Sequence, residues 1–158
     1  MDVISLAAFM KVMNEISSKS IYYFDKYETL NFSIAKQFEK NKNHNDAINT
    51  YERALDQNNL PDTIKLNCFL SLAKIYKNNN LLDLAINYWK HAAEIGSVEA
   101  HIELAKAYEH KLKEYDIAIE YCKKALFILE KDIKSIKSKK LYYELEHRLG
   151  RIILKAKK

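Results

Sequence analysis

The chain has 158 residues, of which 26 are Lys or Arg and 21 are Asp or Glu, so its formal net charge is +5 at pH 7. A chain of this length suits one compact domain or a short array of repeats. With two Gly and one Pro there is little material for hairpin turns, which argues against a β-sheet protein and favours an all-α fold. Cys68 and Cys122 have no paired spacing, so we expect buried thiols in a reducing, cytoplasmic compartment.

Residues 1–27 are predicted to contain a helix with a wide apolar face. The uncharged run over residues 3–10 is much shorter than the roughly 20 apolar residues of a membrane-spanning helix. Asp2, together with the lack of an early Lys or Arg, also differs from a secretory signal. We therefore expect no membrane partner. The apolar face is expected to pack against the first repeat or to mediate self-association.

The following hundred residues contain three similar segments. The segment NFSIAKQFEKNKNHNDAINTYERALDQ, from Asn31, aligns with FLSLAKIYKNNNLLDLAINYWKHAAEI, from Phe69, at a constant offset of 38 residues. A third copy, HIELAKAYEHKLKEYDIAIEYCKKALFI, begins at His101, and its loop is predicted to be one residue longer. The shared positions are Ala35, Phe38, Ala47, Tyr51 and Ala54 in the first copy, Ala73, Tyr76, Ala85, Trp89 and Ala92 in the second, and Ala105, Tyr108, Ala118, Cys122 and Ala125 in the third.

This pattern resembles the tetratricopeptide repeat, in which small and aromatic residues recur at these spacings. The resemblance implies three helix pairs within residues 28–132, at about 28–61, 66–99 and 98–132, stacked as a right-handed all-α solenoid. Small residues let the two helices of a pair approach closely, and neither helix could bury its face alone. We expect about eight helices, with Asn45 or Asp46, Asp62 and Ser97 as helix caps.

Residues 133–158 are predicted to form a basic capping helix, centred on residues 138–155. Residues 131–158 contain 10 Lys and Arg against 3 Asp and Glu, a local charge of +7, which leaves −2 for residues 1–130. A basic patch of this kind suits nucleic acid phosphates or an acidic protein surface. The alternative is that these charged residues bind no partner and form a helix face that is exposed to solvent.

A cation occupies the ninth position of every predicted repeat and of the C-terminal helix. The tetratricopeptide resemblance implies that this position faces the concave groove, which would then favour an acidic peptide or a phosphate backbone. The alternative is a set of unrelated solvated cations, because Lys is common throughout the chain. The four cations are Lys36, Lys74, Lys106 and Arg151. Relatives that bind chaperone tails carry a clamp of basic and amide residues at other positions, and that partner is disfavoured here by Phe32, Ser71, Glu99 and Glu103.

The motif EH(K/R)L occurs twice, at residues 109–112 and 146–149. With it, the C-terminal half resembles the tail of bacterial proteins that join a ribonuclease-H-like, DEDD-type exonuclease domain to tetratricopeptide repeats. The resemblance implies that Asp2 is the last metal-binding carboxylate of a nuclease whose other ligands lie upstream. The chain would then be a fragment, or a relative that kept the tail alone. Two-metal chemistry needs several carboxylates, so this chain by itself is predicted not to be an enzyme.

Other site patterns are weaker. The five His residues have no i, i+4 pair of the kind that binds zinc, and the two Gly stand alone, so we predict no metal, cofactor or small-molecule substrate. Glu109, His110, Glu146 and His147 are predicted to pair across helices, Glu109 or Glu146 with the opposite His or with Arg148. The leading hypothesis is a non-catalytic module that binds proteins through a basic concave groove. The alternative is an accessory region of a DEDD-type exonuclease that helps to hold nucleic acid.

Overall fold

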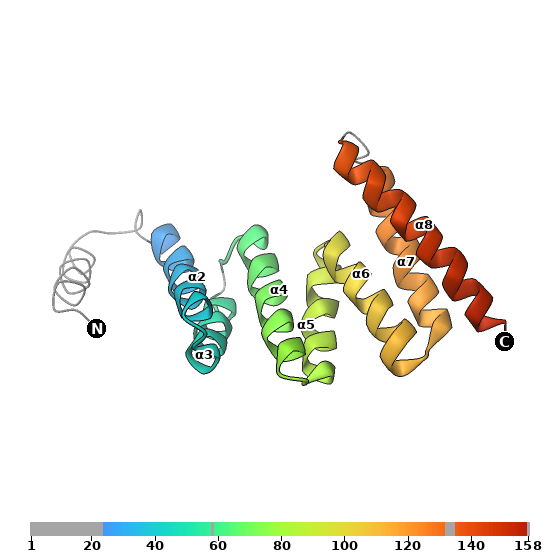
Figure 1. Cartoon of the computed structure of the whole chain (residues 1–158). Helices are drawn as coiled ribbons and strands as arrows, with labels where there is room; N and C mark the ends of the chain where they lie inside the picture. Colours follow the sequence, from blue (N-terminus) through green and yellow to red (C-terminus); the bar gives the residue numbers. More distant parts are fainter. Residues whose placement is uncertain (1–23, 58, 132–134, 158) are drawn as a thin grey trace, which may run out of the picture. The chain divides into compact units, whose positions relative to one another are not determined.

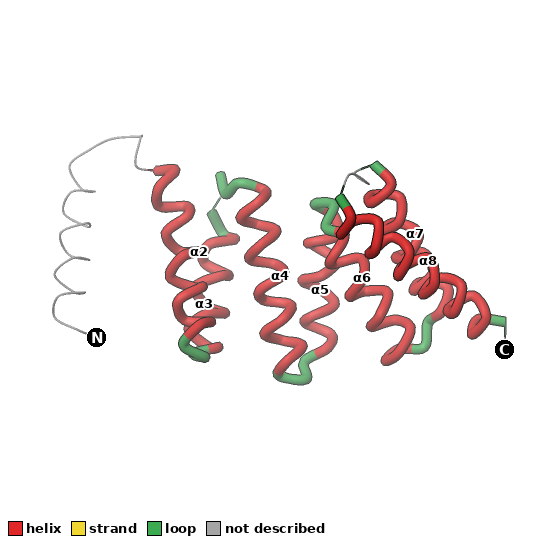
Figure 2. Tube along the Cα trace, turned by 45° about the horizontal axis from the view of Figure 1, so that its top comes forward, coloured by secondary structure: helices red, strands yellow, loops and turns green. Residues whose placement is uncertain are grey.

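The computed structural model describes residues 24–57, 59–131 and 135–157, and all regular structure in these ranges is helical (Figure 2). The all-α prediction is therefore confirmed for the described residues. The predicted N-terminal helix and Asp2 lie outside them. The helices are α2 (Phe24–Lys40), α3 (His44–Leu55), α4 (Asp62–Asn78), α5 (Leu82–Glu94), α6 (Val98–Ala107), the π-helical turn η1 (Tyr108–Leu112), α7 (Tyr115–Glu130) and α8 (Ile136–Ala156) (Figure 1).

These helices divide into two compact units, with the boundary between Ile64 and Lys65. The N-terminal unit contains the pair α2 and α3, which pack against each other. The C-terminal unit contains nearly all of α4 and the helices from α5 to α8. Within it, α6 packs against both α5 and α7, and α8 packs against α7 (Figure 1). Each unit is thus built from helices that contact their neighbours in the chain, as in helical repeat proteins.

The alanines of the repeat pattern form the contacts between paired helices. Every one of them is 0% exposed, which is what close approach of two helix backbones requires. The pattern residue between the two alanines of each second helix is buried beside them, since Tyr51, Trp89 and Cys122 are 0%, 4% and 0% exposed. The predicted packing role of these positions is confirmed. The alanines are Ala35, Ala47, Ala54, Ala73, Ala85, Ala92, Ala105, Ala118 and Ala125.

Replacing Ala118 with Leu should lower the free energy of unfolding by about 1–3 kcal/mol, because extra methylenes in a filled helix contact push the helices apart. Lys123→Leu is a matched control, since Lys123 is exposed on the same helix. Urea denaturation followed by circular dichroism would measure both variants. Equal stability of the two would contradict the assignment of Ala118 to the helix contact.

Helix starts agree in part with the predicted caps. Ser97 caps α6 as predicted, and its hydroxyl accepts a hydrogen bond from the Ala100 N–H at 3.2 Å. The predicted cap at Asn45 or Asp46 is wrong. Asn43 caps α3 instead, because its side-chain oxygen accepts from the Asp46 N–H at 3.5 Å and the helix starts earlier. Asp46 then lies in the first turn, where its negative charge faces the positive end of the helix dipole.

The three loops within helix pairs share one geometry. Each contains a residue with φ near +60°, and the next residue donates its N–H to the carbonyl of the first aromatic residue of the pattern. This closes the C-terminal end of the first helix by satisfying one of its orphan carbonyls. The positive-φ residues are Lys42, Asn80 and Lys113. The hydrogen bonds run from Asn43 to Phe38 at 2.9 Å, from Leu81 to Tyr76 at 2.9 Å and from Glu114 to Tyr108 at 3.0 Å.

The third copy carries its additional residue within the first helix. The loop after η1 keeps the geometry of the other two, so the prediction of a longer loop is wrong. The residue is taken up by the wide turn of η1, because a π-helical turn contains one more residue than an α-helical turn. This turn changes which side chain faces inward. Glu109, directly after the pattern aromatic, is 2% exposed, whereas Lys77 at the same place in the second copy is exposed.

Candidate functional site

Glu109 lies buried at the centre of a cluster of cations. Its side chain is 0% exposed and contacts three residues of α8. Arg148 Nη1 donates to Oε2 at 2.7 Å, Arg151 Nε to Oε1 at 3.1 Å and Lys155 Nζ to Oε1 at 2.7 Å. His110 Nε2 lies 3.2 Å from Oε2. The three residues of α8 recur at the spacing of one helix face, so they reach the same carboxylate.

The cations determine the charge state of Glu109. Burial alone would raise the pKa of its carboxyl, but the hydrogen bonds from Lys155 and Arg151 and the charges of His110 and Arg151 lower the pKa to about 2. Glu109 is therefore ionised at neutral pH. One negative charge faces three permanent positive charges, so the cluster keeps a net positive charge next to solvent. This part of α8 can attract anions while it is held against the third repeat.

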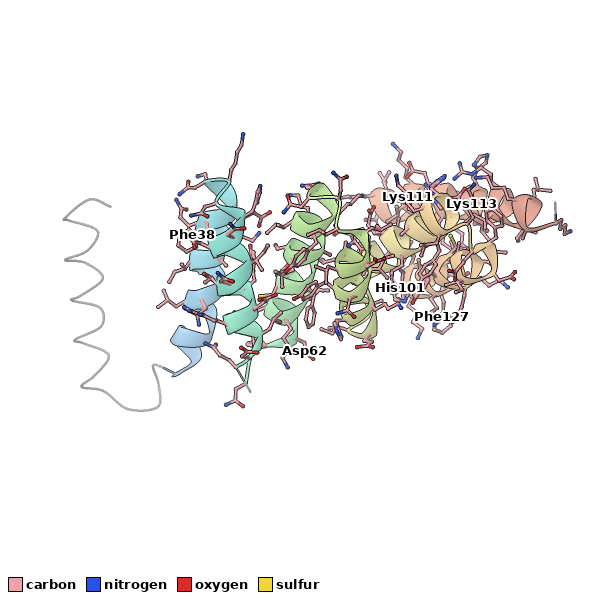
Figure 3. All side chains as sticks on the ribbon, turned by 90° about the horizontal axis from the view of Figure 1, so that it is seen from below. Phe38, Asp62, His101, Lys111, Lys113 and Phe127 are labelled. Atoms are coloured by element: carbon pink, nitrogen blue, oxygen red, sulfur yellow. The ribbon has the colours of Figure 1, made fainter. Side chains whose placement is uncertain are left out.

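A cleft of about 520 Å³, here called the Trp89 cleft, lies beside the cluster within the C-terminal unit. Its apolar walls come from Leu82, Trp89 and Ala107, and the methylene stems of lysines add to them. Lys111 lies at its rim, and Figure 3 shows this residue on one edge of the unit, away from Phe127. The full lining is Lys77, Asn80, Leu82, Trp89, Glu103, Lys106, Ala107, His110 and Lys111.

Glu103 connects two lysines at the cleft. Its carboxylate accepts hydrogen bonds from Lys77 Nζ and from Lys106 Nζ, both at 2.6 Å. Burial alone would raise the pKa of Glu103, but the bonds and charges of Lys106 and Lys77 outweigh burial and hold the pKa below its ordinary value. The Lys77 ammonium also lies 5.6 Å from the centroid of the Trp89 ring, within the range of a cation–π contact.

A second cleft, of about 180 Å³, lies between α6 and α8. Lys106 lines this cleft as well as the Trp89 cleft, so its side chain stands between the two. Arg148 contributes a further cation from α8. The residues of the second cleft are Ile102, Lys106, Leu141, Glu144, Leu145 and Arg148. Helix α6 thus contributes side chains to both clefts, and α8 supplies most of the side chains of the second.

The structure places the predicted groove cations in different settings. Lys106 lines both clefts, Arg151 binds Glu109, and Lys74 is exposed on α4 one turn before Lys77. Lys36 belongs to the N-terminal unit, where its ammonium lies 5.6 Å from the Phe32 ring centroid. Of the four predicted cations, Lys106 therefore lies at the clefts and Arg151 belongs to the cluster around Glu109.

Among the predicted cross-helix pairings, the structure contains Glu109 with Arg148. His110 contacts Glu109 from within the same turn, while Glu146 and His147 are exposed on α8. Lys77, Lys111 and Lys155 were not among the predicted site residues. For Lys155 a signal was present, because it shares a helix face with Arg148 and Arg151.

The described residues contain no cluster of three or more His, Cys, Asp or Glu side chains that could hold a metal ion. Cys68 and Cys122 are buried and unpaired. Burial raises the pKa of the Cys68 thiol to about 12 and that of Cys122 to about 11, so both are protonated and unreactive at neutral pH. Within the same described residues, no helix has both the length and the apolar character needed to cross a membrane.

Residues 98–126 match the family model of the tetratricopeptide repeat. This segment is a tetratricopeptide repeat. The repeat consists of α6, η1 and most of α7, so the buried Glu109 lies inside it. The chain is also similar to an uncharacterized protein, YprB, of Bacillus subtilis (strain 168), with 30% identity over 131 residues. The similarity covers 80% of this chain and 30% of YprB, so the chain spans less than a third of that relative's length.

Proposed function

We propose that the chain is a non-catalytic, cytoplasmic module that binds an acidic protein segment through a basic groove on the first helices of its repeats. Tetratricopeptide repeats serve as protein-interaction modules, which is the general basis of the proposal. The observation that carries its finer part is that α8 has six Lys and Arg against two Glu, and that the two carboxylates at the clefts are outnumbered by the cations around them. Glu109 and Glu103 each meet more positive groups than they can neutralise.

Of the four predicted cations, Lys74, Lys106 and Arg151 are proposed to belong to the groove of the C-terminal unit, and Lys36 is proposed to have the same role within the N-terminal unit. In the C-terminal unit, Lys77, Lys111 and Arg148 add to it. Cations that protrude beside apolar walls suit a flexible peptide, which can place a carboxylate on a lysine and an aliphatic side chain on the wall. A partner held in this way needs no catalytic group.

A double neutralisation tests the groove. Lys106→Gln with Lys111→Gln should weaken binding of a fluorescein-labelled peptide of alternating Glu and Ser by about tenfold, since two charges that face the ligand are lost. Lys123→Gln with Lys157→Gln changes the net charge equally but on other faces, and should have little effect. Fluorescence anisotropy at two salt concentrations would measure both. Equal weakening by the two doubles would attribute binding to diffuse charge and contradict the groove.

The second candidate function is that of an accessory region of a DEDD-type exonuclease that holds nucleic acid. The charge of +7 over residues 131–158 and the sequence resemblance described above favour it. Non-specific binding of a single-stranded oligonucleotide would have a Kd on the order of 10⁻⁴ to 10⁻⁶ M, with a steep salt dependence. A labelled oligonucleotide that binds more tightly than the acidic peptide, and that depends on Lys139 and Lys157, would favour this candidate over the first.

A further inference from the structure

Glu103 occupies the position at which an anionic ligand would meet the Trp89 cleft. Its two carboxylate oxygens each accept one 2.6 Å hydrogen bond, from lysines of successive first helices. The Glu103 side chain is 18% exposed, whereas those of Lys77 and Lys106 are 51% and 41% exposed. The carboxylate thus lies under the two ammonium groups, and both cations remain accessible from solvent.

A carboxylate that approaches these lysines meets a negative charge already in place. It must share the ammonium groups with Glu103 or displace it, and two carboxylates at such a distance repel each other. Protonation of Glu103 does not relieve this repulsion near neutral pH, because the pKa of Glu103 lies below its ordinary value. An acidic ligand therefore binds more weakly than the lysines alone would allow.

The walls of the cleft indicate which kind of side chain a ligand would carry next to its carboxylate. Leu82 is partly buried and offers aliphatic surface next to the two lysines, and the space of about 520 Å³ accommodates one or two side chains rather than a folded domain. Stacking of a nucleic acid base requires an open aromatic face. Trp89 is only 4% exposed, with the Lys77 ammonium near its ring, so the cleft suits a peptide better than a base.

We propose that Glu103 is an internal competitor in the Trp89 cleft. It holds the anion position until a protein segment with a carboxylate next to an aliphatic side chain displaces it from Lys77 and Lys106. The aliphatic side chain then lies against Leu82. This inference rests on the proposed function, because it names the part of the groove that selects the acidic segment and the residue that limits its affinity.

The test compares Glu103→Gln with Glu120→Gln in the full chain. Both variants remove one negative charge, but Glu120 lies on α7, where its carboxylate pairs with Lys124 of the same helix at 2.6 Å. The probe is a fluorescein-labelled peptide of alternating Glu and Leu. We expect Glu103→Gln to bind it about tenfold more tightly than the wild type, because the variant removes one like charge from a partly exposed site. Glu120→Gln should bind it like the wild type.

The inference is overturned if Glu103→Gln binds the probe no more tightly than Glu120→Gln. A second measurement uses Trp89, the single tryptophan of the chain. An aliphatic side chain that enters the cleft against Leu82 should change the emission of Trp89 when the peptide binds, and this change should be absent with a peptide of alternating Glu and Ser at equal saturation. An identical change with both peptides would contradict the aliphatic part of the proposal.

The results separate this inference from the proposed function. Suppose that the wild type binds acidic peptides and that Lys106→Gln with Lys111→Gln weakens this binding. The proposed groove is then supported, even if Glu103→Gln does not increase the affinity. If neither the wild type nor Glu103→Gln binds either peptide, the proposed function fails and the inference fails with it. A gain for a labelled oligonucleotide alone would assign the position to phosphate and overturn the choice of a protein segment.

Discussion

Replacing Glu109 with Gln is expected to lower the free energy of unfolding at pH 7 by up to about 3 kcal/mol. Gln fills nearly the same space, so the variant isolates the effect of the charge. The expected size follows from the pKa of Glu109, which falls from 4.5 to about 2 in the folded chain, because one pKa unit corresponds to about 1.4 kcal/mol. Partial exposure of Arg151 and Lys155 makes this value an upper bound. In thermal unfolding the loss would appear as a decrease in Tm of up to about 6–12 °C.

The pH dependence gives an independent measurement of the same charge. A carboxyl whose pKa is lowered by folding stabilises the folded state above the pKa of the unfolded state, and this contribution is lost as pH falls through the folded pKa. The difference between wild type and Glu109→Gln should therefore be complete above about pH 4.5 and disappear as the pH approaches about 2. Glu120→Gln, at an exposed carboxylate, provides the control. A difference that stays constant over this range would contradict a charge-based role for Glu109.

Replacing Trp89 with Ala should lower the free energy of unfolding by about 3–5 kcal/mol, as is typical of large aromatic residues in cores. Trp89 is 4% exposed and belongs to the same core as Ala85, Ala105 and Ala118, so its removal leaves a cavity between helices. Tyr143→Ala is a suitable control, since Tyr143 is 67% exposed on α8.

Urea denaturation would measure both variants, and the emission maximum of the wild type gives a further check. Because the chain has a single tryptophan, a maximum typical of a solvent-exposed indole would show that Trp89 is not in the core. Equal losses in Trp89→Ala and Tyr143→Ala would lead to the same conclusion.

The helix contacts were predictable from sequence because they depend on local rules. A contact between two helix backbones accepts only small residues, so the positions of Ala73, Ala85 and their equivalents reveal which faces meet. The same rules applied to the start of α6, where Ser97 is a favourable cap. They failed at α3 because Asn43, Asn45 and Asp46 are all good capping residues, and the end of α2 determines which of them is used.

The burial of Glu109 was not predictable in the same way. One additional residue between Ala105 and Ala118 was visible in the sequence, but a loop and a helical turn can each hold it. Formation of η1 points Glu109 inward, and this becomes favourable only when Arg148, Arg151 and Lys155 are present to pair with it. Those cations come from a helix about forty residues later. Whether the additional residue lies in a loop or in a helical turn therefore depends on tertiary contacts. The position of Glu103 between Lys77 and Lys106 depends on such contacts too.

The single carboxylate of Glu109 also determines how α8 is rotated about its own axis. An apolar helix face tolerates small rotations, because neighbouring aliphatic side chains can replace one another. The three cations of α8 tolerate less, because even a fraction of the 100° that separates neighbouring residues would move them away from the Glu109 carboxylate and leave a buried charge poorly paired. Moving the Glu109 carboxylate out of water is unfavourable in itself. Its pairing with three cations of α8 specifies the rotation of that helix. The last described helix is thereby held within a narrower range of rotation than its buried residues Leu145 and Ile152 alone would set.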